Sequence, residues 1–293
     1  MRSSIHVAIG IAVAACLSIL IAPEPVTAAS CESLASLSLP DTTITLAQSV
    51  AAGVFTPPKP PALPIPANYK ALPAFCRATA TMRPVKDSEI KFEVWMPASG
   101  WNGKFVGVGN GGYSGEIWYW SMIEPLARGY AVASTDTGHE GSVMDASFAT
   151  GHSEKWADFG WRAVHEMTVK SKAIVAAFYG DGPRLAYWSG CSTGGRQGLM
   201  EAQRFPTDYN GIIAGAPANY MTHLSAQYVW VAQALHKEPD SFLPPAKLAV
   251  LHDAVLQACD AKDGVKDGIL EDRRGATSIR RPCSARAQTE QPA

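Results

Sequence analysis

The fold is decided by the stretch RLAYWSGCSTGGRQGLMEAQRFPTDYNGIIAGAP, which runs from Arg184 to Pro217. Its first part, Arg184 to Gly190, predicts a strand. A helix is expected over Gly195 to Arg204, and a second strand over Tyr209 to Pro217. Strands that alternate with helices are typical of right-handed crossovers and a mostly parallel sheet. The stretch therefore predicts an α/β fold.

The turn between the first strand and the helix has the pattern of a nucleophile elbow. Gly190-Cys191-Ser192-Thr193-Gly194 matches G-x-S-x-G, in which a sharp turn raises the serine hydroxyl above the end of the sheet. The backbone N–H of Thr193 then points to where an oxyanion would form. We predict Ser192 as a nucleophile and Thr193 as an oxyanion donor. Because glycine and serine are common, the alternative is an ordinary strand-to-helix turn.

A second oxyanion donor is expected from a glycine-rich loop earlier in the chain. Gly109-Asn110-Gly111-Gly112 follows an expected strand at 104–109, where this type of fold places its other donor loop. Gly111 or Gly112 would supply the N–H, and a tight turn is the alternative. Further elements are expected as strands at 90–97 and 130–135 and as helices at 118–128, 154–179, 219–236 and 245–259.

The partners of such a serine are missing from their usual place. In an α/β-hydrolase the acid and the histidine follow the serine in the chain. After Ser192 the histidines are His223, His236 and His252, and none of them follows an expected strand. We expect each to be a surface or packing residue. His139 precedes the serine and does not fit the order either.

The N-terminal 29 residues predict a secretory signal peptide. Arg2 precedes an apolar run from Val7 to Ile21, prolines break the run, and small residues follow. The run is short for a membrane-spanning helix. An alternative is lipoprotein processing at Cys16, which would leave apolar residues where a polar tether is usual.

Export implies an oxidising compartment, in which disulfides form. Removal of the signal leaves five cysteines, and an odd number suggests a missing partner. Cys31 and Cys76 flank the proline-rich stretch PPKPPALPIP at 57–66, which predicts an extended surface connector. We expect these two cysteines to form a disulfide that ties the N-terminal arm to the domain.

The composition excludes several classes of protein. The 293 residues carry 25 basic and 26 acidic side chains, so the formal net charge is −1. This balance gives no footprint for a nucleic acid and no polybasic membrane patch. The eight tryptophans exceed the needs of one core. We expect most of them to pack inside, and some to line a site for aromatic or sugar-like ligands.

An acidic loop near the C-terminus suggests a cation site. Cys259-Asp260-Ala261-Lys262-Asp263-Gly264-Val265-Lys266-Asp267-Gly268-Ile269 places three carboxylates between glycines that allow tight turning. Calcium prefers several carboxylates together with backbone carbonyls. The expected ligands are the side chains of Asp260, Asp263 and Asp267 and the carbonyls of Val265 and Ile269. The spacing is not that of an EF-hand, and a solvated acidic turn is the alternative.

Taken together, these motifs make the chain similar to the tannase/feruloyl esterase family. The resemblance spans roughly Cys76 to Asp272. Its most specific parts are the CSTGG elbow and the DGVxDG loop. It is also carried by SxIxFEVWMP from Ser88, WNGKFVGVGNGGYSG from Trp101, STDTGH from Ser134, YWSGCSTGGRQGLMEAQRFPTDYNGIIAGAPA from Tyr187 and CDAKDGVKDGILED from Cys259.

The resemblance implies an exported serine esterase of α/β-hydrolase fold with a large lid. Family members cleave galloyl, feruloyl or related aromatic esters and carry calcium in the lid. The resemblance assigns Ser192 as nucleophile, Thr193 and the Gly111/Gly112 loop as oxyanion donors, and calcium to the acidic loop. The monomeric or oligomeric state stays undefined, and a small aromatic ester is the expected partner.

The chain departs from the family near its end. The family pattern continues past this length to a triad aspartate and histidine, and to cysteines that would pair with Cys191 and Cys259. Residues 275–293 no longer resemble the family, and a shifted reading frame could restore the pattern there. The alternative is a natural short form. On the resemblance, this chain alone is expected to be nearly inactive.

The sequence therefore predicts the start of an α/β-hydrolase followed by part of a lid. The expected segments are a signal peptide at 1–29, an arm at 30–75, a core at 76–218, a lid with the calcium loop at 219–274 and a tail at 275–293. Two other hypotheses are an exported protein that binds an aromatic ligand without turnover, and a misfolded fragment with an open sheet edge.

Overall fold

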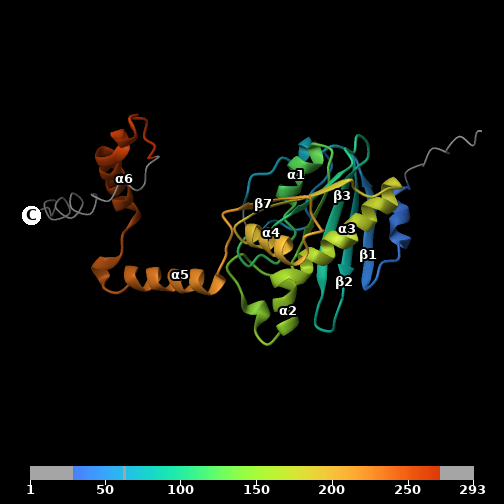
Figure 1. The fold of residues 1–293 in the computed structure, drawn as a ribbon, viewed down its shortest axis with the longest axis horizontal. Helices are drawn as coiled ribbons and strands as arrows, with labels where there is room; N and C mark the ends of the chain where they lie inside the picture. Colours follow the sequence, from blue (N-terminus) through green and yellow to red (C-terminus); the bar gives the residue numbers. More distant parts are fainter. Residues whose placement is uncertain (1–28, 62–63, 271–293) are drawn as a thin grey trace, which may run out of the picture. The chain divides into compact units, whose positions relative to one another are not determined.

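A computed structural model describes residues 29–61 and 64–270, except for the side chains of Asp240 and Asp263. Residues 1–28 of the expected signal peptide at 1–29, which include Cys16, lie outside the described residues, as do Cys283 and the rest of the tail at 275–293. The chain divides after Ala218 into two units (Figure 1). The first contains the sheet and the Ser192 turn, and the second begins at Asn219.

The first unit is built on a seven-stranded sheet in the order β1-β2-β3-β5-β4-β6-β7. The strands are β1 Thr42–Val50, β2 Phe75–Met82, β3 Ile90–Pro97, β4 Lys104–Val108, β5 Ala131–Thr135, β6 Leu185–Cys191 and β7 Gly211–Gly215. The pairs β4/β5, β4/β6 and β6/β7 are parallel, and the other three are antiparallel. The α/β fold is confirmed, although the sheet is mixed rather than mostly parallel.

Helices cover both faces of this sheet (Figure 1). They are α1 Tyr119–Ala127, α2 Ser153–Ala157, α3 Ala163–Tyr179 and α4 Thr193–Arg204. Short 3₁₀ turns lie at Cys31–Ser36, Tyr69–Ala71 and Ser147–Ala149. The strand pleat sends alternate side chains to opposite faces. Phe92 and Val94 of β3 pack in the cluster that includes α3, whereas Trp95 packs in the one that includes α1.

The expected helix at 154–179 has a wider turn inside it. α2 leads into a π-helical turn, Asp158–Arg162, before α3 begins. The cause is visible in the contacts of Arg196 on α4. Its guanidinium donates to the carbonyl oxygens of Phe159 and Gly160 at 3.1 and 2.9 Å. A side chain that hydrogen-bonds to backbone carbonyls of a helix competes with the hydrogen bonds inside the helix, and this competition produces irregular turns.

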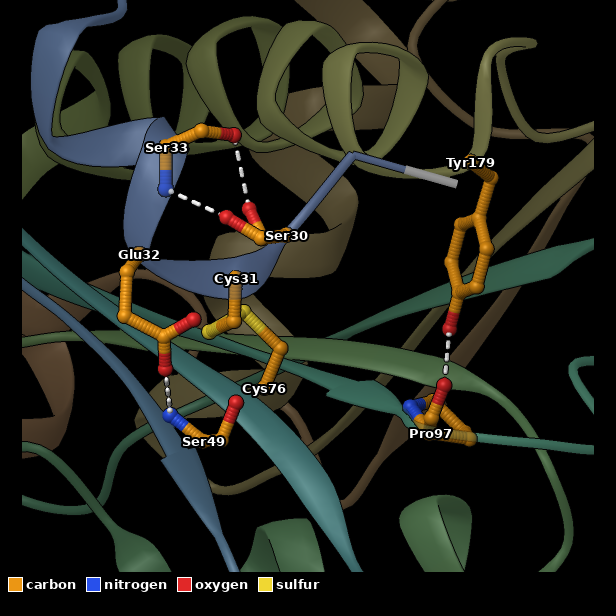
Figure 2. Close-up of a disulfide and its surroundings, with 8 residues drawn as sticks. All are labelled: Ser30, Cys31, Glu32, Ser33, Ser49, Cys76, Pro97 and Tyr179. Atoms are coloured by element: carbon orange, nitrogen blue, oxygen red, sulfur yellow. Dashed lines mark hydrogen bonds between the residues drawn. A yellow bond between two sulfur atoms is a disulfide. The ribbon is translucent and has the colours of Figure 1, made fainter. Parts of the chain in front are cut away.

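The N-terminal arm is fixed to the domain by the predicted disulfide, which is confirmed. Cys31 and Cys76 are bonded, and their Cα atoms lie 5.5 Å apart (Figure 2). Glu32 beside the bridge accepts a hydrogen bond from the backbone N–H of Ser49 on β1 at 3.0 Å. The arm thereby adds strand β1 to the antiparallel side of the sheet.

The second unit consists of helices and loops in its described part. α5 spans Met221–Leu235 and α6 spans Pro245–Cys259, with 3₁₀ turns at Pro239–Ser241 and Asp260–Asp263. Both helices were expected from the sequence. Among the described residues, no helix combines the length and the apolar run that crossing a bilayer requires.

Candidate active site

Ser192 lies at a strained turn between β6 and α4. Its φ is +60° and its ψ is −118°, a conformation that an L-residue adopts only when its surroundings enforce it. The backbone supplies that enforcement. The N–H of Ser192 donates to the Gly215 carbonyl on β7, and the Ser192 carbonyl accepts from Ala218, both at 3.0 Å. The residue is exposed, so its hydroxyl is accessible at the end of the sheet.

Close backbone packing explains why glycine flanks this turn. A Cβ at Gly190 would lie 2.4 Å from the Gly194 carbonyl oxygen, and one at Gly109 would lie 2.5 Å from the Gly194 Cα. Neither position has room for a side chain. The elbow and the glycine loop are therefore pressed against each other by backbone alone.

Polar contacts fix the glycine loop beside the first turn of α4. The buried Asn110 donates through Nδ2 to the carbonyls of Thr135 and Glu116, at 2.9 and 3.0 Å. Its backbone N–H donates to Oε1 of Gln197 on α4 at 3.1 Å. The hydroxyl of Thr193 donates to the Gly112 carbonyl oxygen at 2.8 Å. Two segments about eighty residues apart in sequence thus form one local structure.

Backbone N–H groups of the glycine loop and of Thr193 have no acceptor among the described residues. Among the described residues, the amides of Gly111, Gly112 and Thr193 make no hydrogen bond to a backbone or side-chain atom. The amide of Thr193 also stands at the N-terminus of α4, the positive end of the helix dipole. Unpaired donors at this place are what an oxyanion hole requires.

Charge near the elbow is carried by Arg196, one turn into α4. Burial lowers the pKa of its guanidinium to about 10. The group packs over the Phe159 ring, with 4.9 Å from Cζ to the ring centroid. Arg196 thereby couples the nucleophile helix to the π-helical turn and holds a positive charge close to the elbow.

The histidines of the first unit are engaged elsewhere. His139 is buried, where burial lowers its pKa, and its Nε2 lies 2.8 Å from the Tyr113 carbonyl. His152 pairs with Asp87 at the surface, and His165 with Asp208. Within residues 29–61 and 64–218, no histidine hydrogen-bonds the Ser192 hydroxyl. His223, His236 and His252 belong to the second unit.

Two cysteines near these sites are thiols. Cys191, adjacent to Ser192, is free and exposed, and Cys259, at the end of α6, is free and buried.

The acidic loop of the second unit is folded back on itself. Oδ1 of the buried Asp260 accepts the Gly268 N–H at 2.9 Å, and Oδ1 of Asp267 accepts the Ile269 N–H at 3.0 Å. Gly264 and Gly268 have φ of +97° and +80°, which the turn needs. The hydrogen bond from Gly268 brings the C-terminal end of the loop next to Asp260 at its start.

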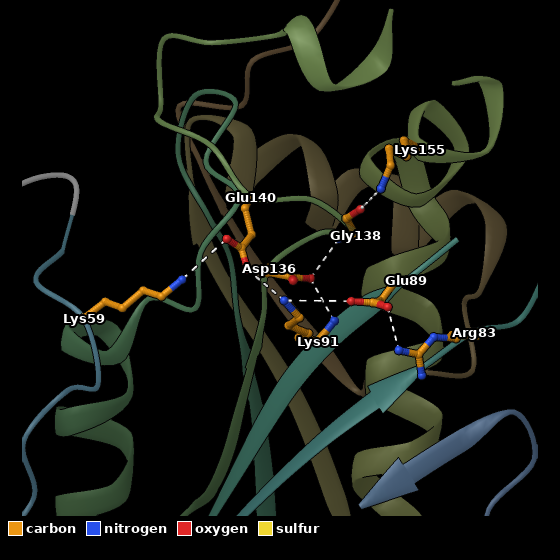
Figure 3. Close-up of polar contacts among 8 residues, drawn as sticks. All are labelled: Lys59, Arg83, Glu89, Lys91, Asp136, Gly138, Glu140 and Lys155. Atoms are coloured by element: carbon orange, nitrogen blue, oxygen red, sulfur yellow. Dashed lines mark hydrogen bonds and ion pairs between the residues drawn. The ribbon is translucent and has the colours of Figure 1, made fainter. Parts of the chain in front are cut away.

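A cavity of about 490 Å³ lies elsewhere on the first unit. The proline-rich connector and the aromatic segment Trp118–Trp120 line it, and Ser192 and its glycine loop do not. Lys59 and Lys91 both pair with Glu140 near it (Figure 3). Buried Asp136 accepts hydrogen bonds from the backbone N–H groups of Lys91 and Gly138, each at 2.9 Å. Burial raises the Asp136 pKa to about 7.

A polar cluster around Glu93 was also not expected from the sequence. Glu93 on β3 receives the Arg77 guanidinium at 2.8 and 2.5 Å, the Tyr119 hydroxyl at 2.8 Å and the Trp95 indole at 3.0 Å. Both carboxylate oxygens of Glu93 therefore accept hydrogen bonds although the residue is buried in the core. The sequence signal for this cluster would have been two neighbouring strands, β2 and β3, whose alternating side chains bring Arg77 next to Glu93. The strand β2 was not expected from the sequence.

A strained serine between a parallel strand and a helix, faced by a glycine loop, defines an α/β-hydrolase. Solved structures agree. The crystal structure of feruloyl esterase B from Aspergillus oryzae superimposes with a TM-score of 0.75 and 32% identity, over 84% of this chain and 49% of that chain. Tannin acyl hydrolase from Aspergillus niger has a TM-score of 0.63 and 25% identity, over 80% and 44% of the two chains.

The chain belongs to the tannase and feruloyl esterase family, whose model matches residues 76–288. The match extends beyond residue 274, where the sequence analysis ended the family resemblance. An uncharacterised esterase of Xanthomonas campestris pv. campestris is 44% identical over 246 residues, which are 84% of this chain and 42% of that protein. Feruloyl esterase B of Aspergillus niger is 38% identical over 70% of this chain and 39% of that protein. The chain spans less than half the length of these relatives.

Proposed function

We propose that this chain carries the nucleophile and the oxyanion hole of a carboxylic ester hydrolase. The observation that supports this best is that the backbone N–H groups of Gly111, Gly112 and Thr193, close to the exposed and strained Ser192, have no acceptor among the described residues. The serine Oγ would attack the ester carbonyl carbon, and the amides would bind the developing oxyanion. The alcohol would leave, and water would then release the acid from the acyl-serine.

The substrates we propose are esters of aromatic acids of the feruloyl or galloyl kind. Support comes from relatives whose names state feruloyl esterase and tannin acyl hydrolase. Turnover by this chain alone is expected to stay low, because the Ser192 hydroxyl has no histidine partner within the described part of the first unit. A serine without its base keeps only the contributions of binding and the oxyanion hole.

The acidic loop is proposed as a calcium site. Its donors are all oxygens, and the fold back to Asp260 fits a single hard cation. The side chains of Asp260, Asp263 and Asp267 and the carbonyls of Val265 and Ile269 would hold it. Bound there, calcium would neutralise the carboxylates and fix the loop after α6.

Export is the proposed destination. The disulfide between Cys31 and Cys76 supports it, because such bonds persist in oxidising compartments. The proposed signal peptide at 1–29 can be checked by sequencing the N-terminus of the product recovered from the medium or the periplasm. An intact N-terminus on correctly located protein would contradict it.

The second candidate function is binding of an aromatic acid or ester without turnover. It is favoured by the same absence of a histidine at Ser192 in residues 29–61 and 64–218. The two candidates share the ligand and differ in whether Ser192 becomes acylated.

Acylation by an activated feruloyl ester separates them. We expect mass spectrometry to find one feruloyl group on the peptide that contains Ser192, and none there in Ser192→Ala. Ser189→Ala is the matched control, because Ser189 is exposed on the same strand and its hydroxyl makes no hydrogen bond to a described residue. Ligand binding without an adduct in the native chain would favour the second candidate. Rapid multiple turnover of methyl ferulate would overturn the low-turnover expectation.

A further inference from the structure

A cluster of metal-ligating side chains lies apart from the Ser192 turn. His165 comes from α3, Glu201 from α4, and Asp208 from the loop that leads to β7. One ligand atom of each lies within 4.8 Å of the other two. Nδ1 of His165 is 2.7 Å from Oδ2 of Asp208. Three elements thus converge on one point with an imidazole and two carboxylates.

The decisive observation is the state of Glu201. The residue is fully buried, and neither of its carboxylate oxygens has a hydrogen-bond partner among the described residues. A buried carboxylate without a donor or a counterion is strongly unfavourable. The nearby Lys172 offsets part of this cost through its charge, but its ammonium donates to the backbone carbonyl of Asp208 and makes no hydrogen bond to Glu201. The carboxylates of Glu201 and Asp208 therefore require a neutralising group, either a cation or a proton that they share.

We propose that His165, Glu201 and Asp208 form a binding site for a single divalent cation of the zinc type. An imidazole nitrogen with two carboxylate oxygens is a donor set that suits Zn²⁺ and disfavours the hard cations Ca²⁺ and Mg²⁺. Tetrahedral Zn²⁺ with bonds of about 2.0–2.2 Å places its ligand atoms roughly 3.3–3.5 Å apart. Metal binding would therefore widen the present distance of 2.7 Å between Nδ1 of His165 and Oδ2 of Asp208.

The surroundings supply access and orientation. The His165 side chain is 23% exposed, so a cation can enter from that side and keep water as its fourth ligand. The ring of His165 stacks on Phe205 at 3.7 Å between centroids, which fixes its plane. The proposed metal would tie α3, α4 and the loop before β7 together. Its role is to stabilise the structure, and it does not depend on the esterase proposal.

The test is titration of the metal-stripped, full-length protein with Zn²⁺ by calorimetry, followed by the absorption spectrum with Co²⁺. We expect one equivalent to bind, with visible d–d bands and no thiolate charge-transfer band. The spectrum excludes binding through Cys191, the exposed free thiol. Thermal unfolding should shift upward on addition of Zn²⁺.

Variants assign the site. Glu201→Gln and His165→Ala should lose the bound equivalent and the thermal shift. His152→Ala is the matched control, because His152 pairs with Asp87 at the surface, and this variant should keep both. His165 is partly exposed, so its variant tests the proposal even if Glu201→Gln fails to fold. Equal zinc binding in His165→Ala would overturn the proposal. So would no binding by the native chain, which would leave a proton shared by Glu201 and Asp208 as the neutralising group.

Discussion

Thr193 joins the elbow to the glycine loop through a single hydroxyl. Its Oγ1 donates to the Gly112 carbonyl at 2.8 Å, and its backbone N–H has no acceptor in the part of the chain that the structure describes. Thr193→Val keeps the branched shape and the N–H but removes the donor. We expect a loss of about 1 kcal/mol in the free energy of unfolding. We also expect faster hydrogen exchange in residues 109–114 and slower acylation of Ser192.

Thr193→Ser is the control for that substitution, because serine retains the hydroxyl. It should restore both the slow exchange and the acylation rate. If Thr193→Val leaves exchange at 109–114 unchanged, the hydroxyl does not hold the loop, and the backbone packing of Gly109 on Gly194 carries the contact alone.

The buried carboxyl of Asp136 makes the stability of the folded protein depend on pH. Burial raises its pKa to about 7 in the folded protein, above the usual value of 3.8. The folded state therefore binds more protons than the unfolded state between about pH 4 and 7, and the Asp136 contribution to stability falls as the pH rises through that window. Asp136→Asn keeps an oxygen acceptor for Lys91 and Gly138 and removes the titration.

We expect Asp136→Asn to gain stability relative to the native protein at pH 8, with the gain disappearing near pH 4. Urea unfolding at several pH values measures this difference. Asp145→Asn is a control of opposite sign, because the backbone N–H of Ser147 lowers the Asp145 pKa. A constant difference between Asp136→Asn and the native protein across this range would contradict the assignment.

At the scale of elements, the disulfide holds the N-terminal arm against the sheet and α3. It closes a loop of 45 residues that contains β1 and the proline-rich connector. The Ala29 N–H also donates to the Phe178 carbonyl at the end of α3. Replacing Cys31 and Cys76 by serine should lower the free energy of unfolding by about 2–5 kcal/mol.

Urea unfolding of the oxidised protein, the reduced protein and the double variant measures the disulfide. Reduction should lower the free energy of unfolding of the native protein to that of the double variant. Cys191→Ser is the matched control, because Cys191 is a free thiol and its replacement should leave the effect of reduction intact. If the oxidised protein, the reduced protein, the double variant and Cys191→Ser were equally stable, hydrogen bonds such as the one from Ser49 to Glu32 would hold the arm in place of the disulfide.

The elements that the sequence predicted are those with strong local patterns. The strand at 90–97 is β3, and the expected helix at 245–259 is α6. β1 and β2 escaped prediction because their residues are small and polar. FCRATATM alternates between buried Ala78, Ala80 and Met82 and partly exposed threonines, with little apolar bulk to mark a strand. Pairing with β3, which is long-range, stabilises these strands.

The candidate site also has parts that follow from local sequence and parts that depend on long-range contacts. The elbow could be predicted, because its five residues are adjacent and the glycines are fixed by close packing. The cluster of His165, Glu201 and Asp208 could not, because it gathers three elements at spacings that match no motif. The unpaired amides also needed the structure, since a sequence does not show which N–H groups lack acceptors.

The whole molecule has two units, and the proposed calcium belongs to the second one alone. The ligand loop follows α6 and is closed by the bonds from Gly268 to Asp260 and from Ile269 to Asp267. These carboxylates repel one another without a cation, so Ca²⁺ should lower the free energy of the folded loop by linkage. We expect hydrogen exchange to slow in peptides that cover 260–269 and to stay unchanged in β1, at 42–50, which lies in the first unit.

Asp267→Asn should abolish this protection, since it removes a proposed ligand. Asp253→Asn should keep it, since Asp253 lies within α6 and outside the loop. Exchange measured by mass spectrometry with Ca²⁺, with Mg²⁺ and with chelator distinguishes a selective site from a charge effect. Protection by Mg²⁺ equal to that by Ca²⁺ would indicate a solvated acidic turn that attracts any divalent ion. Protection that spread to 42–50 would show that calcium stabilises both units together and would contradict an effect confined to the loop.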